Sequence, residues 1–241
     1  MRTLLQSCRL YGIVDMGYPR PEQVEERTRA LIAGGVRIIQ LRAKGVDLAQ
    51  VRELAVLMQG ICREGGAIFV LNDYPEMAAD IGADAVHVGQ DGGSLASVRA
   101  IVGDTMIVGR STHSPEQAAA AHAEGADYIG FGPLFPTGTK PGRPSIGLQD
   151  IAAVQSAAGS MPVFCIGDWD TQCMIGTHSV AILERWRECG LGADTDWAAV
   201  CAAVVDTLRN CKKGRQKGRW DILDGYGYLP YDKIPDEGVS R

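Results

Sequence analysis

Short apolar runs alternate with amphipathic stretches along most of the chain. Stretches with helical periodicity, such as residues 21–35 and 47–66, end in a glycine pair. The apolar runs between such stretches have five or six residues and predict seven β-strands, at residues 11–15, 37–42, 67–72, 85–89, 106–111, 128–132 and 162–167. Strands that alternate with helices at intervals of about 20–30 residues are typical of parallel βαβ units.

The number of these units favours an α/β fold of the closed (β/α)8, or TIM barrel, type over an open sheet. No G-x-G-x-x-G motif follows the first strand, which argues against the open dinucleotide-binding fold. Residues 179–183 are a candidate eighth strand, although the gap before them is short for a helix, and residues 196–210 have the pattern of a last barrel helix. We predict a catalytic barrel over residues 1–210, with an atypical seventh and eighth unit. An irregular C-terminal extension would occupy residues 211–241.

Composition and charge narrow the classes of function. A chain of 241 residues suits a single barrel, and its net charge of −5 argues against a general nucleic-acid or membrane-surface partner. No run approaches the roughly 18 apolar residues of a membrane span. The first strand pattern follows the N-terminus without a signal-peptide pattern, so we expect a cytoplasmic protein. The seven cysteines include no C-x-x-C pair, which leaves no zinc-site spacing.

Polar side chains follow five consecutive predicted strands. In a barrel these strand ends share one face, where the chemistry of such folds takes place. The groups are Gln40, Arg42 and Lys44; Asn72 and Asp73; His87, Gln90 and Asp91; Ser111 to Ser114; and Thr137, Thr139 and Lys140.

Gln40, Arg42 and Lys44 would share one face of the second strand if its period of two continues. An arginine fork and a lysine point charge are suited to holding a diphosphate. The alternative is a rim of salt bridges without a ligand.

The other strand ends also have two interpretations. Asp73 suits Mg²⁺, which takes one or two carboxylates together with substrate phosphate oxygens, but Asn72 or Asp73 could instead cap the next helix. His87 could be a core histidine with satisfied nitrogens. Ser114 and Gln117 have the spacing of a capping box around a proline at the first helical position, so part of the polarity there is structural.

The loop GPLFPTGTKPGRPSIG, residues 132–147, follows the sixth predicted strand. Its glycines and prolines exclude a helix or a central strand. Because this loop follows the C-terminal end of a barrel strand, its hydroxyls and cations would lie on the functional face.

Five segments together resemble the thiamine phosphate synthases and the related thiazole tautomerases. QLRAK, LND, VHVGQD, STHS and GPLFPTGTKP occur in the order and at the spacing of that family, and the resemblance covers about residues 10–167. Gln90 and the T-x-T-K threonine favour the synthase. The resemblance implies a Mg²⁺-dependent transferase of thiamine biosynthesis that acts on two small molecules. It would join 4-amino-5-hydroxymethyl-2-methylpyrimidine diphosphate to a thiazole phosphate carboxylate. The products would be thiamine phosphate, pyrophosphate and CO2, formed through a carbocation left by departing pyrophosphate.

The resemblance also implies roles for single residues. Proteins of this family often self-associate, which allows a homo-oligomer here. Arg42, Lys44 and Lys140 would stabilise the leaving diphosphate, and Asp73 and Asp91 would hold the metal. The residues that would bind substrate are Gln40, Arg42, Lys44, Asn72, Ser111, Thr137, Thr139, Lys140 and Gly167.

Two departures from the family pattern put parts of this assignment in doubt. The usual second metal ligand corresponds to Gly92, and Asp91 lies one residue early. Asp168 replaces a glycine beside the expected thiazole phosphate and would repel it. A local replacement over residues 168–190, by divergence or a reading-frame error, would explain a regular barrel pattern on both sides.

Two other functions therefore remain open. A thiazole tautomerase would draw on His113 or His122 as an acid–base group. A catalytically inactive barrel would bind the pyrimidine diphosphate or thiamine phosphate without turnover.

Overall fold

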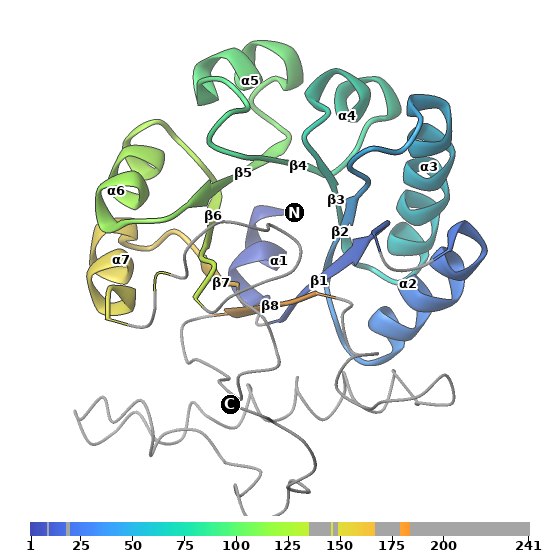
Figure 1. Cartoon of the computed structure of the whole chain (residues 1–241), viewed down its shortest axis with the longest axis horizontal. Helices are drawn as coiled ribbons and strands as arrows, with labels where there is room; N and C mark the ends of the chain where they lie inside the picture. The colour runs from blue at the N-terminus through green and yellow to red at the C-terminus, as the bar shows by residue number, and fades with distance from the viewer. Residues whose placement is uncertain (9, 18–19, 135–145, 147–148, 167–178, 184–241) are drawn as a thin grey trace, which may run out of the picture.

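Eight parallel strands close into a barrel in chain order in the computed structural model (Figure 1). The structure describes residues 1–8, 10–17, 20–134, 146, 149–166 and 179–183. The strands are β1 (Leu10–Asp15), β2 (Ile38–Arg42), β3 (Ile68–Asn72), β4 (Ala85–Val88), β5 (Ile107–Thr112), β6 (Tyr128–Phe131), β7 (Val163–Cys165) and β8 (Ser179–Leu183). The predicted closed barrel of parallel strands is thus confirmed, and the candidate eighth strand pairs with both β7 and β1. Most of the chain between β7 and β8 and all of it after β8, where the atypical seventh and eighth units are predicted, lies outside the described residues.

Helices surround the ring of strands (Figure 1). They are α2 (Val24–Ala33), with the short 3-10 helix η1 (Pro21–Gln23) before it, α3 (Leu48–Glu64), α4 (Pro75–Ile81), α5 (Leu95–Val102), α6 (Pro115–Ala123) and α7 (Ile151–Ala158). Side-chain caps start three of them, because Asp47, Ser94 and Ser114 accept hydrogen bonds from backbone N–H groups of the first turn. The predicted serine cap of α6 is confirmed, whereas Gln117 accepts from the N–H of His113 instead of that of Ser114.

A further helix, α1 (Arg2–Ser7), precedes the first strand and was not predicted. Its Leu5 and the following Cys8 are buried in one cluster with the inward-facing side chains of the strands, such as Ile38 and Ile68. The helix therefore closes the N-terminal end of the barrel, and the C-terminal strand ends form the opposite mouth.

Alternation along the strands divides the core into two layers. In β2, Ile39 and Leu41 pack outward against the helices, whereas Ile38 and Gln40 point inward. Gly109 of β5 makes room for the largest inward side chain, because a Cβ there would lie 2.0 Å from Cζ of Tyr128. A residue with a side chain at this position would displace the Tyr128 ring.

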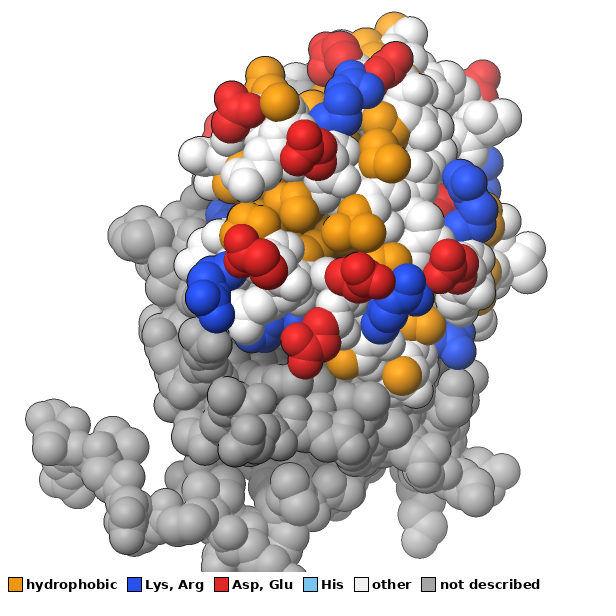
Figure 2. All heavy atoms as spheres, turned by 90° about the vertical axis from the view of Figure 1, so that its right-hand side faces the viewer, with side chains coloured by type: hydrophobic (Ala, Val, Ile, Leu, Met, Phe, Trp, Pro, Cys, Tyr) orange, Lys and Arg blue, Asp and Glu red, His pale blue; other side chains and the backbone are white. Residues whose placement is uncertain are grey.

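The outer surface around α3 carries apolar side chains among acidic and basic ones (Figure 2). Exposed apolar side chains of α3 are Leu48, Val56 and Leu57. Over the part of the chain that is described, every helix is too short or too polar to cross a membrane. The predicted helix at residues 196–210 and the extension at 211–241 lie outside the described residues, so the proposed domain boundaries stay predictions.

Candidate functional site

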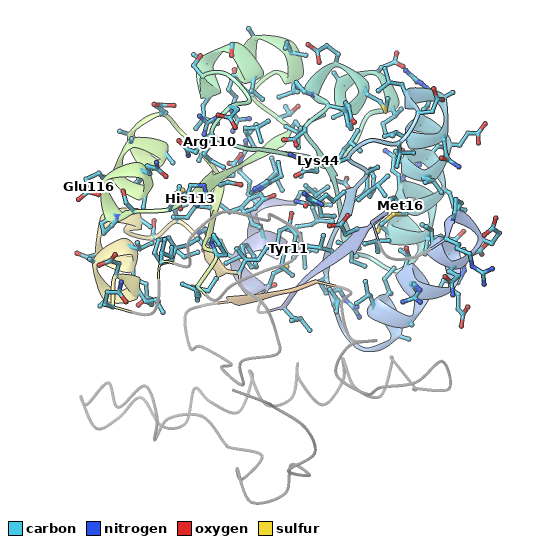
Figure 3. All side chains as sticks on the ribbon, in the orientation of Figure 1. Tyr11, Met16, Lys44, Arg110, His113 and Glu116 are labelled. Carbon is cyan, nitrogen blue, oxygen red and sulfur yellow. The ribbon has the colours of Figure 1, made fainter. Side chains whose placement is uncertain are left out.

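Polar side chains at the C-terminal ends of β1 to β5 lie together at the mouth of the barrel. Strand register brings Asp15 beside Arg42 and Asn72 beside His87. Figure 3 shows Tyr11 inside the ring of strands and Lys44 at the edge of the ring. The structure therefore brings together side chains that the sequence placed on separate strands.

Arg42 forms a largely buried ion pair with Asp15. Nη1 of Arg42 donates to Oδ2 of Asp15 at 2.5 Å, and the two side chains are 14% and 3% exposed. The N–H of Gly17 donates to Oδ1 of the same carboxylate at 3.1 Å. A guanidinium has five N–H donors in a fixed plane, and this pair fixes the orientation of the Arg42 side chain. Asp15 was not predicted as a site residue; the available signal was an acidic residue at the end of an apolar strand.

Lys44 forms a second, more exposed ion pair with Asp73. Nζ lies 3.0 Å from Oδ2, and the side chains are 56% and 30% exposed. Burial raises the pKa of Asp73, but the Lys44 ammonium and the N–H of Gly89 outweigh it, so this pKa lies below its usual value. The carboxylate is therefore held as an anion at the mouth.

The alternative role of Asn72 and Asp73 as helix caps is wrong. Helix α4 has Tyr74 as its N-cap, and no side chain caps it. Asp73 instead has a φ of 65°, a left-handed conformation that few non-glycine residues adopt. Such backbone geometry is often found at functional sites.

Asp91 lies on a tight turn after β4. Arg110 stabilises this turn, because its guanidinium donates to the carbonyls of Gly93 at 2.7 Å and Gln90 at 3.3 Å. The N–H of Gly92 donates to the carbonyl of Gly89 at 3.0 Å, and a Cβ at Gly92 would lie 3.1 Å from Cβ of Val88. Asp91 itself is exposed. Within the described ranges no three His, Cys, Asp or Glu side chains converge as metal ligands.

A line of hydrogen bonds runs across the barrel below these ion pairs. Nε2 of Gln40 donates to the Tyr11 hydroxyl at 2.9 Å, and that hydroxyl lies 2.9 Å from the hydroxyl of Tyr128. The Tyr128 hydroxyl lies 3.1 Å from Nδ1 of His87, whose Nε2 lies 3.0 Å from Oγ of Ser111. The interpretation of His87 as a core histidine with satisfied nitrogens is thereby confirmed. The line of hydrogen bonds also connects two residues predicted to bind substrate, Gln40 and Ser111.

Both tyrosines of this line were missed, because each resembles an ordinary core residue of an apolar strand. Tyr11 is 3% exposed and Tyr128 is fully buried. Burial raises the pKa of each hydroxyl. Both phenols therefore keep their proton.

The two other histidines of interest lie in different places. His113 follows β5 at the mouth, and its Nδ1 contacts the carbonyl of Gly132. His122 lies in the last turn of α6, where Nδ1 is 3.3 Å from the carbonyl of Ala157. Because α6 runs from the mouth to the other end of the barrel, His122 is remote from the mouth.

Comparison with known proteins adds to this geometry. The model of the family described as thiamine monophosphate synthase matches residues 10–176. The chain belongs to the thiamine monophosphate synthase family.

Individual relatives agree with the family match. A thiamine-phosphate synthase of Thermus thermophilus is 42% identical over 166 residues, which are 67% of this chain and 78% of the relative. One from Acidothermus cellulolyticus is 38% identical over 173 residues, 71% of this chain and 81% of the relative. Another from Gloeobacter violaceus is 38% identical over 170 residues, 70% of this chain. In that case the chain spans only 48% of the relative's length.

A solved structure supports the fold. A thiamine phosphate pyrophosphorylase from Pyrococcus furiosus has a TM-score of 0.72 at 24% identity, over 86% of this chain and 98% of that one. The tryptophan synthase of Mycobacterium tuberculosis reaches 0.60 at 13% identity, over 86% and 95% of the two chains. The barrel is thus shared with enzymes beyond the thiamine monophosphate synthase family.

The family match includes the whole described mouth and ends at residue 176, three residues before the first residue of β8. Several predicted site positions fall outside the described residues: Thr137, Thr139, Lys140, Gly167 and Asp168.

Proposed function

We propose that this chain is a thiamine phosphate synthase, which joins 4-amino-5-hydroxymethyl-2-methylpyrimidine diphosphate to a thiazole phosphate or its carboxylate. Membership of the thiamine monophosphate synthase family supports this function. The observation that carries it is the arrangement at the mouth. Arg42 and Lys44 there form ion pairs with Asp15 and Asp73, carboxylates at the ends of the two strands that flank β2.

The leaving diphosphate develops negative charge as its bond to the pyrimidine breaks. Fixed cations that face this charge lower the barrier, because they need no reorganisation at the moment of reaction. Asp15 holds Arg42 in place, and Lys44 can reach the same ligand from the rim. Ser111 would donate to the diphosphate, whereas Gln40 and Asn72 would orient the pyrimidine.

Asp73 would hold Mg²⁺ together with diphosphate oxygens, and Asp91 is the proposed second ligand. The half-exposed, anionic carboxylate of Asp73 fits such an ion, which needs few protein ligands when phosphate oxygens supply the rest. When bound, the ion would neutralise charge on the diphosphate. Asp91 fits less directly, since in the family pattern the usual second ligand corresponds to Gly92.

From the family resemblance, Lys140 would reach over the diphosphate, and Thr137, Thr139 and Gly167 would contact the thiazole phosphate. The cytoplasmic location and self-association also stay predictions.

Release of pyrophosphate tests the proposed function. The purified chain is incubated with the pyrimidine diphosphate, the thiazole phosphate and Mg²⁺. We expect release that requires both substrates, and that falls by about 10²-fold in Lys44→Met. Arg52→Met is the matched control, because Arg52 pairs with Asp80 on the outer surface.

Binding measured by calorimetry separates the alternatives. Pyrimidine diphosphate binding without pyrophosphate release would contradict the synthase and support the inactive barrel. Release from the pyrimidine diphosphate alone, at the same rate with or without the thiazole phosphate, would also contradict it.

A further inference from the structure

The line of Gln40, Tyr11, Tyr128, His87 and Ser111, here called the relay, has a direction. The Gln40 amide nitrogen donates to Tyr11, and in the arrangement that uses every proton of the line the Tyr11 hydroxyl donates to Tyr128. In that arrangement Tyr128 donates to Nδ1 of His87. A neutral imidazole that accepts at Nδ1 carries its proton on Nε2, and it donates to Oγ of Ser111.

The direction has consequences at both ends of the relay. The Ser111 hydroxyl accepts from His87, so its own proton is available to a ligand at the mouth. The Gln40 nitrogen faces Tyr11 in this direction, so its carbonyl oxygen is the acceptor that Gln40 can present to a ligand. If every hydrogen bond in the relay ran in the opposite direction, both ends would change. The Gln40 nitrogen would then face the ligand, and the Ser111 hydroxyl could only accept a hydrogen bond from it.

Burial makes this coupling strict. Tyr128 is fully buried, and Tyr11, Gln40 and His87 are at most 8% exposed. An unmatched donor or acceptor in such a buried place is costly. The ring of Tyr128 also has one position, because it fills the space above Gly109 and packs edge-on against Phe164 with centroids 5.6 Å apart.

A fully ionised diphosphate, as in its complex with Mg²⁺, can only accept hydrogen bonds, so it favours the direction in which Ser111 donates. We infer that the relay is a positioning device that couples diphosphate binding to the orientation of the Gln40 amide, and thereby selects a pyrimidine with an exocyclic N–H donor at position 4, the 4-amino ring, over its 4-oxo analogue, which presents an acceptor at that position. This inference rests on the proposed function for the identity of the ring. Tyr11, Tyr128 and His87 are positioning residues, since they act through Gln40 and Ser111.

The tautomer of His87 tests the direction without any turnover. The full chain is labelled with 15N-histidine, and the signals of its four histidines are assigned with the variant His87→Gln. In the presence of Mg²⁺ and inorganic pyrophosphate we expect His87 to carry its proton on Nε2. A proton on Nδ1 with a bare Nε2 would overturn the inference, because the relay would then run the other way.

Ligand selectivity tests the coupling. Calorimetry compares the dissociation constants of the 4-amino and 4-oxo pyrimidine diphosphates in the unchanged chain and in Tyr128→Phe, which keeps the ring and removes the central hydroxyl. We expect the preference for the amino form to fall by about tenfold, the value of one good hydrogen bond. Tyr11→Phe breaks the relay one link nearer to Gln40 and should act in the same way, which keeps the test available if one variant fails to fold.

Thr28→Val is the matched control. It also removes a buried hydroxyl, which donates to the carbonyl of Val24 at 2.7 Å in α2, and it should leave the amino-to-oxo ratio unchanged. Equal weakening of both ligands in Tyr128→Phe would show that Tyr128 has only a structural role and would overturn the inference. Failure of the unchanged chain to bind the pyrimidine diphosphate would refute the proposed function and the ring selectivity with it. The His87 tautomer would still report on the direction of the relay separately.

Discussion

The two ends of the barrel both hold carboxylates with cations, but they do so differently. At the N-terminal end, Asp127 receives Nε of Arg2 at 2.7 Å, a guanidinium nitrogen of Arg99 at 2.6 Å and the N–H of Val108 at 2.8 Å. At the mouth, Asp73 has Lys44 at 3.0 Å and the weaker contact with Gly89 at 3.3 Å. The Asp127 side chain is 12% exposed, against 30% for Asp73.

This contrast separates ion pairs that hold the fold from ion pairs that are open to a ligand. Asp127 joins α1 and α5 to the start of β6, and its oxygens are used within the protein. Asp73 and Lys44 keep exposed atoms that a diphosphate or a metal ion could reach. In barrels of this kind the C-terminal face carries the chemistry and the opposite face contributes stability. Arg42 combines both properties, because its partner Asp15 is buried while Arg42 faces the mouth.

The largest effect is expected for Arg42→Ala, which should disturb both properties at once. Loss of one partner leaves the Asp15 carboxylate buried without its cation, which costs about 3–5 kcal/mol of folding stability. Thermal unfolding would measure this loss, and pyrophosphate release from the folded fraction should fall as well. A variant with unchanged melting temperature would contradict the buried character of this pair.

Asp73→Asn should reduce activity and leave stability nearly intact. The carboxylate is partly exposed, and asparagine keeps the acceptor for the N–H of Gly89. We expect pyrophosphate release to fall about 10²-fold, with a higher Mg²⁺ concentration needed for half-maximal rate. Titration of Mg²⁺ at saturating substrate measures both. If the rate stayed the same while the protein lost stability, Asp73 would belong with Asp127 as a structural carboxylate.

The strands and several residues of the mouth could be predicted from the sequence. The strands follow from their apolar runs, and Gln40, Arg42, Asn72, Asp73 and Ser111 follow from the rule that parallel strands bring their C-terminal ends together. Helix α1 has six residues and no side-chain cap, and α7 also lacks one, so neither gives a clear local signal.

The missing part of the site depends on register across strands. Asp15 lies beside Arg42 only because β1 and β2 pair in that register. Tyr11 and Tyr128 meet at 2.9 Å although 117 positions separate them in the chain. Local patterns identify such residues as core, and the closed barrel alone shows that their hydroxyls meet.

Asp127→Asn should give the opposite result to Asp73→Asn, with lower stability and unchanged turnover of the folded protein. Burial raises the pKa of Asp127, but Arg2, the N–H of Val108 and Arg99 outweigh it, so this pKa lies below the ordinary 3.8. The carboxylate therefore contributes stability that is fully present above its unfolded-state pKa and is lost as the pH falls through its folded-state pKa.

We expect Asp127→Asn to cost about 1.5 kcal/mol near neutral pH. The difference from the unchanged chain should shrink as the pH falls below about 4, where the carboxylate of the unchanged chain becomes protonated. Urea unfolding at a series of pH values measures this. A difference that grew toward acid would contradict the assignment of Asp127 as an ionised clamp.

The smallest effect is expected for Arg52→Met, on the outer surface away from both ends. Arg52 and Asp80 lie 2.5 Å apart, as close as Arg42 and Asp15, but their side chains are 48% and 62% exposed. Solvent screens such a pair, so its loss should change stability by less than about 0.5 kcal/mol and leave turnover unaltered. Urea unfolding of Arg52→Met and Arg42→Ala side by side compares two ion pairs of equal length. A similar loss in both would mean that contact distance, and not burial, determines which ion pairs hold this barrel together.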